Sequence, residues 1–256
     1  MDAAEKDKAQ WIMNSKPVST WLAVDRSRTL NIRPETAPID IMNTLSFSAA
    51  TIAFTLTKNT EFPVLSFFCG LRRKGSRDNS ASGPKAVRKS LNAQLLKFIL
   101  AKRPDADLAF LERKKLMEKS RGKSKYAKEL FRQLLESLPK QDVVFIILDS
   151  LSRLGGTDRE GGHDLVREMH GLVTEMQHIV IKVLVTDAMP GSPIRDLAHL
   201  TLYVPDEIDG ERHDSHTMTL DSQRLGVIDR FQMRQRERSV SAEEDSSGDS
   251  SDDDRF

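Results

Sequence analysis

The chain has 256 residues, of which 38% are hydrophobic, and this fits one sizeable α/β domain with appendages or two small domains. The sequence has no stretch near the ~18 consecutive apolar residues of a membrane span, and its first eleven residues lack the apolar core of a secretory signal. A single cysteine excludes an internal disulfide, so we expect a cytoplasmic protein, with the nucleus as the alternative.

The net charge of +1 conceals an acidic C-terminal tail. Residues 239–256 contain seven acids, one arginine and six serines, so we expect this tail to be disordered. Residues 207–238 form an extension ahead of the tail and include a basic segment at 230–238. Serines with an acid three residues later suit acid-directed kinases, and the candidate phosphorylation sites are Ser241, Ser246, Ser250 and Ser251.

In chain order, residues 1–24 are predicted to form a helical lead-in and residues 25–206 an α/β domain. Apolar runs predict strands at residues 28–32, 63–69, 143–149, 179–187 and 200–204. The segments between them are predicted helices, including an uncharged one from Ile41 and one that starts near Pro84. Because strands alternate with helices and three strands are continuously apolar, we predict a three-layer α/β/α fold with a mainly parallel five-stranded sheet.

"FIILDSLSRL" (residues 145–154) is similar to the metal-binding strand of NACHT-type members of the STAND class of P-loop NTPases. "IKVLVTDAMP" (residues 181–190) is similar to the strand that follows it in these proteins. "SFFCGL" with "GPKAVRKSLNAQLL", and the lead-in "WIMNSKPVSTWL", resemble nephrocystin-like NACHT segments of filamentous fungi. The resemblance implies a P-loop-NTPase-like sheet, ATP or GTP with magnesium as cofactor, and nucleotide-driven switching.

The family's motifs can be compared with this sequence position by position. Asp149 matches the family's magnesium-holding aspartate, and Thr186 matches the threonine of the next strand. The other chemical positions depart from the family pattern. Ser152 and Arg153 stand where the family has an acidic pair, and Asp187 follows Thr186 where the family has a serine. Without these partners, we expect Asp149 to stabilise the turn after its strand through its own backbone.

The predicted phosphate-loop position, residues 33–46, reads "RPETAPIDIMNTLS". A working phosphate loop uses glycines to aim backbone N–H groups at the phosphate, with a lysine and a helix N-terminus adding positive field. This segment has neither glycine nor lysine, and its two prolines remove two N–H donors. Glu35 and Asp40 add negative charge, so we expect no triphosphate to bind here.

Two alternative functions remain open. A divergent ATP- or GTP-binding NTPase would use Asp149 and an anion-binding loop of Gly70, Lys74, Gly75 and Ser76, although a solvated basic loop also explains that segment. A basic protein associated with nucleic acid would use residues 72–89, 113–128 and 230–238, but these segments have few aromatic residues for base stacking.

We therefore expect a nucleotide-free, NACHT-like regulatory or protein-interaction module without catalytic residues. We expect it to need no metal and no cofactor, since its histidines lack the cysteine or carboxylate partners that would complete a metal site. A protein is the expected partner, rather than nucleic acid or a membrane. The sequence leaves the oligomeric state open.

Overall fold

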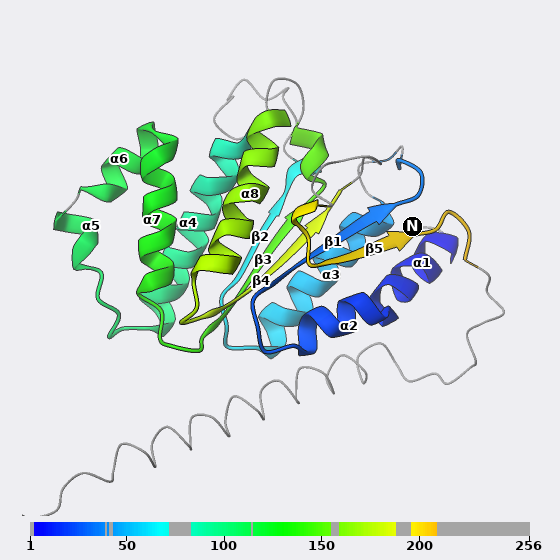
Figure 1. The fold of residues 1–256 in the computed structure, drawn as a ribbon, viewed down its shortest axis with the longest axis horizontal. Helices are drawn as coiled ribbons and strands as arrows, with labels where there is room; N and C mark the ends of the chain where they lie inside the picture. Colours follow the sequence, from blue (N-terminus) through cyan, green and yellow to red (C-terminus); the bar gives the residue numbers. More distant parts are fainter. Residues whose placement is uncertain are drawn as a thin grey trace, which may run out of the picture.

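The computed structural model describes residues 3–38, 40, 43–71, 83–113, 115–154, 159–187 and 196–208 (Figure 1). Residues 209–256 lie outside these ranges, so the predictions of a basic extension and a disordered acidic tail fall outside the described residues. Among the described helices, none combines the length and the apolar character that a membrane crossing needs.

A single five-stranded sheet forms the centre of the described structure (Figure 1). Its strands are β1 (Arg28–Pro34), β2 (Val64–Phe68), β3 (Val143–Asp149), β4 (Val180–Thr186) and β5 (Leu200–Val204). Their order is β2-β3-β4-β1-β5, and every pairing between neighbours is parallel. All five strands therefore end at the same edge of the sheet, where loops and helix N-termini gather.

Helices cover both faces of this sheet (Figure 1). One layer contains α1 (Ala3–Asn14), α2 (Lys16–Ala23) and α3 (Thr44–Asn59). The other contains α4 (Gly83–Lys102), α7 (Ser124–Glu136) and α8 (Arg159–Glu175), with the short helices α5 (Ala109–Arg113) and α6 (Leu116–Gly122) beside α7. The predicted fold class, a three-layer α/β/α domain with a mainly parallel five-stranded sheet, is confirmed.

The apolar run of β3 shows why this strand forms the middle of the core. All seven of its residues are buried. Val144, Ile146 and Leu148 pack against the α4–α8 layer, whereas Val143, Phe145 and Ile147 pack against the α1–α3 layer. Because successive side chains of a strand point to opposite faces, a strand covered on both faces must be apolar throughout.

The N-terminal helices are part of the core. Trp21 on α2 is fully buried, its ring meets Phe145 edge-on at 5.9 Å between centroids, and its Nε1 donates to the Arg28 carbonyl at 3.2 Å. Ser15 caps α2 by accepting from the Val18 amide. The helix predicted from Ile41 begins instead at Thr44, because Asn43 caps it.

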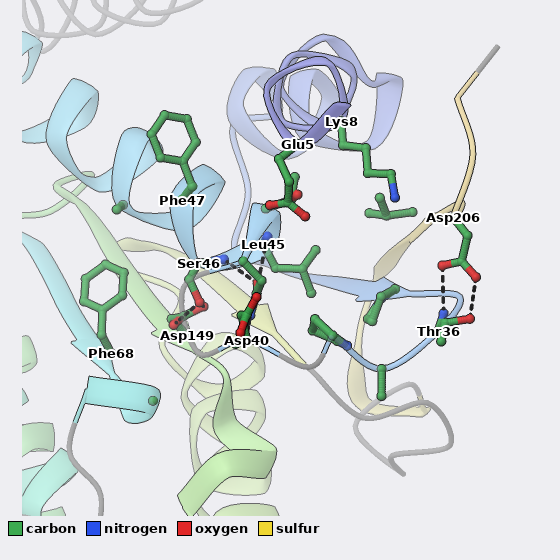
Figure 2. A pocket seen from close by; sticks show the side chains of 18 of the residues that line it. Glu5, Lys8, Thr36, Asp40, Leu45, Ser46, Phe47, Phe68, Asp149 and Asp206 are labelled. Atoms are coloured by element: carbon green, nitrogen blue, oxygen red, sulfur yellow. Dashed lines mark hydrogen bonds between the residues drawn. The ribbon is translucent and has the colours of Figure 1, made fainter. Parts of the chain in front are cut away.

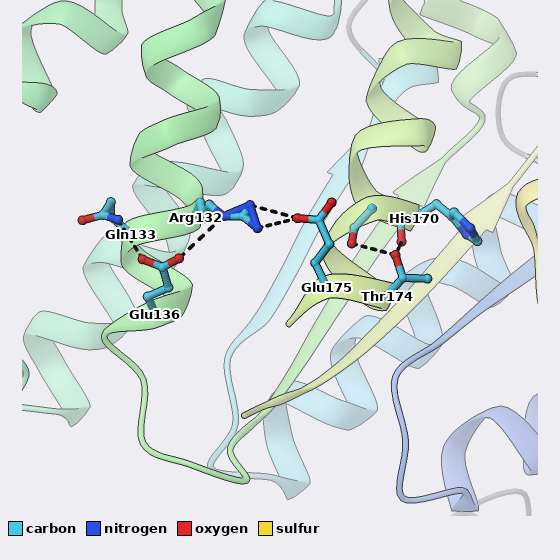
Figure 3. Close-up of polar contacts among 7 residues, drawn as sticks. Arg132, Gln133, Glu136, His170, Thr174 and Glu175 are labelled. Atoms are coloured by element: carbon cyan, nitrogen blue, oxygen red, sulfur yellow. Dashed lines mark hydrogen bonds and ion pairs between the residues drawn. The ribbon is translucent and has the colours of Figure 1, made fainter. Parts of the chain in front are cut away.

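Ion pairs join the helices of the α4–α8 layer. Figure 3 shows Arg132 on α7 pairing with Glu175 on α8 and with Glu136 one turn further along α7. These side chains are exposed, and such pairs contribute little to stability. The Arg88–Glu168 pair between α4 and α8 is mostly buried, with a 2.8 Å distance from Nε to the carboxylate, so its removal would be more costly.

Candidate functional site: a cavity at the carboxyl edge of the sheet

A cavity of about 1030 Å³ lies at the edge where the parallel strands end (Figure 2). The last residues of four strands line it: Pro34 of β1, Phe68 of β2, Asp149 of β3 and Val204 of β5. The first turn of α3 and the N-terminal half of α1 complete its wall. Open α/β sheets bind their ligands at this edge, so the cavity is the candidate functional site.

Asp149 is buried at the base of this cavity and is held by hydroxyl groups (Figure 2). Ser46 Oγ donates to its carboxylate at 2.9 and 3.1 Å, and Thr186 Oγ1 donates at 2.6 Å. Burial raises the pKa of Asp149, while the hydrogen bonds from Thr186, Ser46 and Ser150 lower it in part. The expectation that Asp149 stabilises its own turn through the backbone is wrong, because the hydroxyl groups of α3 and β4 satisfy the carboxylate.

Asn43 occupies the position where a phosphate would meet the helix N-terminus. Its Oδ1 accepts from the amides of Leu45 and Ser46 at 3.0 and 3.1 Å, and its Nδ2 donates to the Asp40 carbonyl at 3.1 Å. The first-turn amides of a helix are the groups that bind anions in phosphate loops. Here two of them are already satisfied by a side chain of the same chain.

Arg153 lies where the family resemblance implies an acidic residue, and it holds the loop before α3. Its Nη2 donates to the carbonyls of Pro38 and Asp40 at 3.1 and 2.6 Å. The guanidinium thus binds two backbone oxygens of the segment at the predicted phosphate-loop position. A carboxylate at this position could neither make these bonds nor keep the loop in this place.

Among the described residues, the charged side chains that line the cavity are mainly acidic. Asp149 ends β3 and Asp40 lies in the segment before α3, Glu5 and Lys8 project from α1, and Asp206 lies beyond β5 (Figure 2). Only one of these five side chains is basic. A nucleotide triphosphate would therefore meet more negative than positive charge.

Two further features shape the wall of the cavity. Phe47 of α3 and Phe68 of β2 lie on one side of it, and Phe47 is 48% exposed (Figure 2). On the other side, Asp206 accepts from the amide of Thr36 at 3.2 Å and from the Thr36 hydroxyl, which joins the ends of β1 and β5. The cavity therefore has an aromatic wall opposite a polar one.

The residues predicted as a nucleotide-binding remnant, Asp149 and Thr186, lie in direct contact. Gly70 of the predicted anion-binding loop lines the same cavity as Asp149. The rest of that loop, Lys74, Gly75 and Ser76, lies outside the described residues, and so do the candidate phosphorylation sites Ser241, Ser246, Ser250 and Ser251. In the described part of the chain, no group of three His, Cys, Asp or Glu side chains could hold a metal ion.

Sequence reasoning missed four residues of the site. Asn43 was detectable, because an asparagine directly before an apolar helix is a capping signature. Ser46 then follows three residues later, in the first turn, but its contact with Asp149 spans 103 residues of sequence. The Thr36–Asp206 contact spans 170 residues and has no local signal.

Comparisons with known proteins give a distant structural likeness. No protein-family model matches the chain, and no curated protein matches it. The solved structure of the Aeropyrum pernix ORC2 protein, in ADPNP–ADP complexes, is similar over 80% of this chain and 48% of that one, with 13% identity and a TM-score of 0.41. The chain thus spans about half the length of that protein. Because this likeness is too weak to assign a function, the fold assignment rests on the parallel pairing of the five strands and the two helical layers.

Proposed function

We propose that this chain is a nucleotide-free, P-loop-NTPase-like domain of NACHT type that acts as a regulatory or protein-interaction module. The observation that carries the proposal is the capping of α3 by Asn43, whose Oδ1 takes the Leu45 and Ser46 amides. A phosphate at the same place would have to displace this side chain and its hydrogen bonds, and the loop offers no lysine in return.

The surrounding charges support the same proposal. Asp40 and Asp206 line the cavity, and the guanidinium of Arg153 is engaged by two backbone carbonyls. Magnesium could offset part of this repulsion by binding Asp149. However, the Asp149 carboxylate already accepts hydrogen bonds from Ser46 and Thr186.

Equilibrium binding of fluorescent ATP and GTP analogues, each with magnesium, tests the proposal on the full chain. We expect no saturable binding up to about 1 mM, which is the weak end of specific recognition. A dissociation constant below about 10 μM for either nucleotide would contradict the proposal. The same titration with magnesium omitted is the control for nonspecific association of the fluorophore.

One observation favours a second function, a divergent NTPase. Gly70 and Asp149 line the same cavity, so a loop that starts at Gly70 could deliver an anion-binding group next to that carboxylate. Phosphate release from ATP by the wild type and by the Asp149→Asn and Asp149→Ala variants tests this function. If the background rate is the same in all three proteins, Asp149 supports no hydrolysis and this function is eliminated.

A further inference from the structure

The cavity at the carboxyl edge has the size and chemistry of a peptide-binding site. Its volume of about 1030 Å³ is at the upper end of ligand pockets and exceeds what a single side chain fills. Phe47 and Phe68 offer aromatic surface on one side, and Asp40 and Asp206 offer negative charge elsewhere on the wall (Figure 2). An occupant that combines an aromatic side chain with positive charge would satisfy both.

The exposure of Phe47 also points to an occupant. Phe47 lines the cavity and is 48% exposed. A large aromatic side chain that is left half-exposed at a cavity wall favours contact with an apolar or aromatic group.

The chain itself contains a segment with the required chemistry. Residues 230–238, "RFQMRQRER", carry four arginines and one glutamate, and they include Phe231 and Met233. Arginine and aromatic side chains are the residues that most often supply binding energy at protein interfaces. The net charge of the segment, +3, is opposite in sign to that of the cavity lining.

The position of the described C-terminal end favours an intrachain occupant. Asp206 lines the cavity, and the described part of the chain stops two residues later at Ile208. About 20 residues separate Ile208 from the basic segment, and a chain of that length can span up to about 70 Å. The linker is therefore long enough for the segment to return to the cavity, and tethering raises the effective concentration of the segment there.

We infer that residues 230–238 of the same chain dock in the cavity at the carboxyl edge of the sheet. Phe231 enters beside Phe47 and Phe68, and the arginines face the acidic side chains of the wall. This inference rests on the proposed function, because the docked segment would occupy the space that a nucleotide would need.

A photo-crosslinking amino acid, p-benzoylphenylalanine, placed at position 47 of the full chain tests the inference. After irradiation, mass spectrometry identifies the crosslinked peptides. The matched control has the same amino acid at Leu100, which is 65% exposed on the last turns of α4 in the other layer. We expect crosslinks to residues 230–238 within single chains, with a yield about tenfold higher from position 47 than from position 100.

Charge variants show whether the contact is specific. Replacing Arg230, Arg234, Arg236 and Arg238 by Gln should lower the yield from position 47 by about tenfold, since each pairing with a surface carboxylate adds modestly to affinity. The control replaces four exposed basic residues of the α6 region, Lys115, Arg121, Lys123 and Lys125, and should leave the yield unchanged. Equal yields from positions 47 and 100, or crosslinks found only in covalent dimers, would overturn the inference.

Added nucleotide separates this inference from the proposed function. If the crosslink forms and ATP with magnesium does not suppress it, both stand. If the nucleotide suppresses it, the segment docks as inferred but the nucleotide-free function is wrong. If no crosslink forms and the fluorescent nucleotides do not bind, the docking inference is wrong while the proposed function stands.

Discussion

Two buried ionisable side chains lie toward opposite ends of the sheet, Asp149 at the end of β3 and Lys182 near the beginning of β4. Both form hydrogen bonds with uncharged hydroxyl or carbonyl groups. Asp149 accepts from hydroxyl groups, whereas Lys182 Nζ donates to the Trp21 carbonyl at 2.8 Å and to the Val24 carbonyl. Burial raises the pKa of Asp149 and lowers the pKa of Lys182 to about 7.

The difference between the two lies in what surrounds them. Lys182 is fully enclosed, and its hydrogen bonds attach the end of α2 to the sheet, which makes it a structural residue. Asp149 lines a cavity that an occupant can enter. Burial of an ionisable group therefore accompanies the attachment of a helix at one end of the sheet and leaves a polar site available at the other.

The largest loss of stability is expected from a substitution near Lys182, where α2 packs on the sheet. Replacing the fully buried Trp21 by Ala removes a large side chain from the core together with its hydrogen bond to Arg28. We expect a loss of about 3–5 kcal/mol in the free energy of unfolding, measured by urea denaturation. The chain has one other tryptophan, the partly buried Trp11, and Trp11→Ala is the control, which should cost clearly less. Equal losses would contradict the structural role of α2.

The pH dependence of stability should show that the pKa of Lys182 is lowered in the folded chain. The unfolded chain binds this proton up to about pH 10.5 and the folded chain only up to about pH 7, so the free energy of unfolding rises with pH between these values. Relative to Lys182→Met, the wild type should gain about 1.4 kcal/mol per pH unit in this window. Urea denaturation at pH 7 and pH 9 measures the difference. The control is Lys58→Met at an exposed position, for which a constant difference is expected.

An intermediate effect is expected at the cap of α3. Asn43→Ala leaves the Leu45 and Ser46 amides without their acceptor and should cost about 1 kcal/mol in the free energy of unfolding. Asn14→Ala, at an exposed position that caps no helix start, is the matched control. A variant that binds ATP at micromolar concentration would show that Asn43 alone blocks the site and that the acidic lining does not.

The smallest effect is expected from the titration of Asp149, which changes the stability of the fold at acidic pH. Because its pKa is raised in the folded chain, Asp149 stabilises the fold below the unfolded value of 3.8, and this contribution is lost as the pH rises through the folded value. Relative to Asp149→Asn, the wild type should therefore lose stability as the pH rises above 3.8, the opposite direction to Lys182. Thermal unfolding at stepped acidic pH values measures this trend, with the exposed Asp7→Asn variant as control.

Much of the fold could be predicted because its signals are local. The apolar runs of β3 and β4 indicate strands buried on both faces, and helices between them require parallel pairing. Asp149 was also locatable, since it ends an apolar run at the edge where ligands bind. These inferences need only the periodicity and order of elements.

The contacts of the site could not be predicted in the same way. The partners of Asp149 come from α3 and β4, and the sequence offered a local turn as an equally simple explanation. Lys182 interrupts an apolar run, but nothing in the surrounding residues indicates that the carbonyls of Trp21 and Val24, about 160 residues earlier, accept its hydrogen bonds. Such pairings depend on how the layers meet, which propensity and pattern do not specify.

Both ends of the described chain lie near the cavity, because α1 contributes Glu5 and Lys8 to its wall and the segment after β5 contributes Asp206. This arrangement has a practical consequence. An affinity tag fused ahead of α1 is joined to a helix that lines the cavity, and one fused after Ile208 is joined two residues from Asp206, which lines it too. A polyhistidine tag retained during a binding assay could compete with the occupant under study. Purification through a removable tag, followed by its proteolytic cleavage, would avoid that artefact.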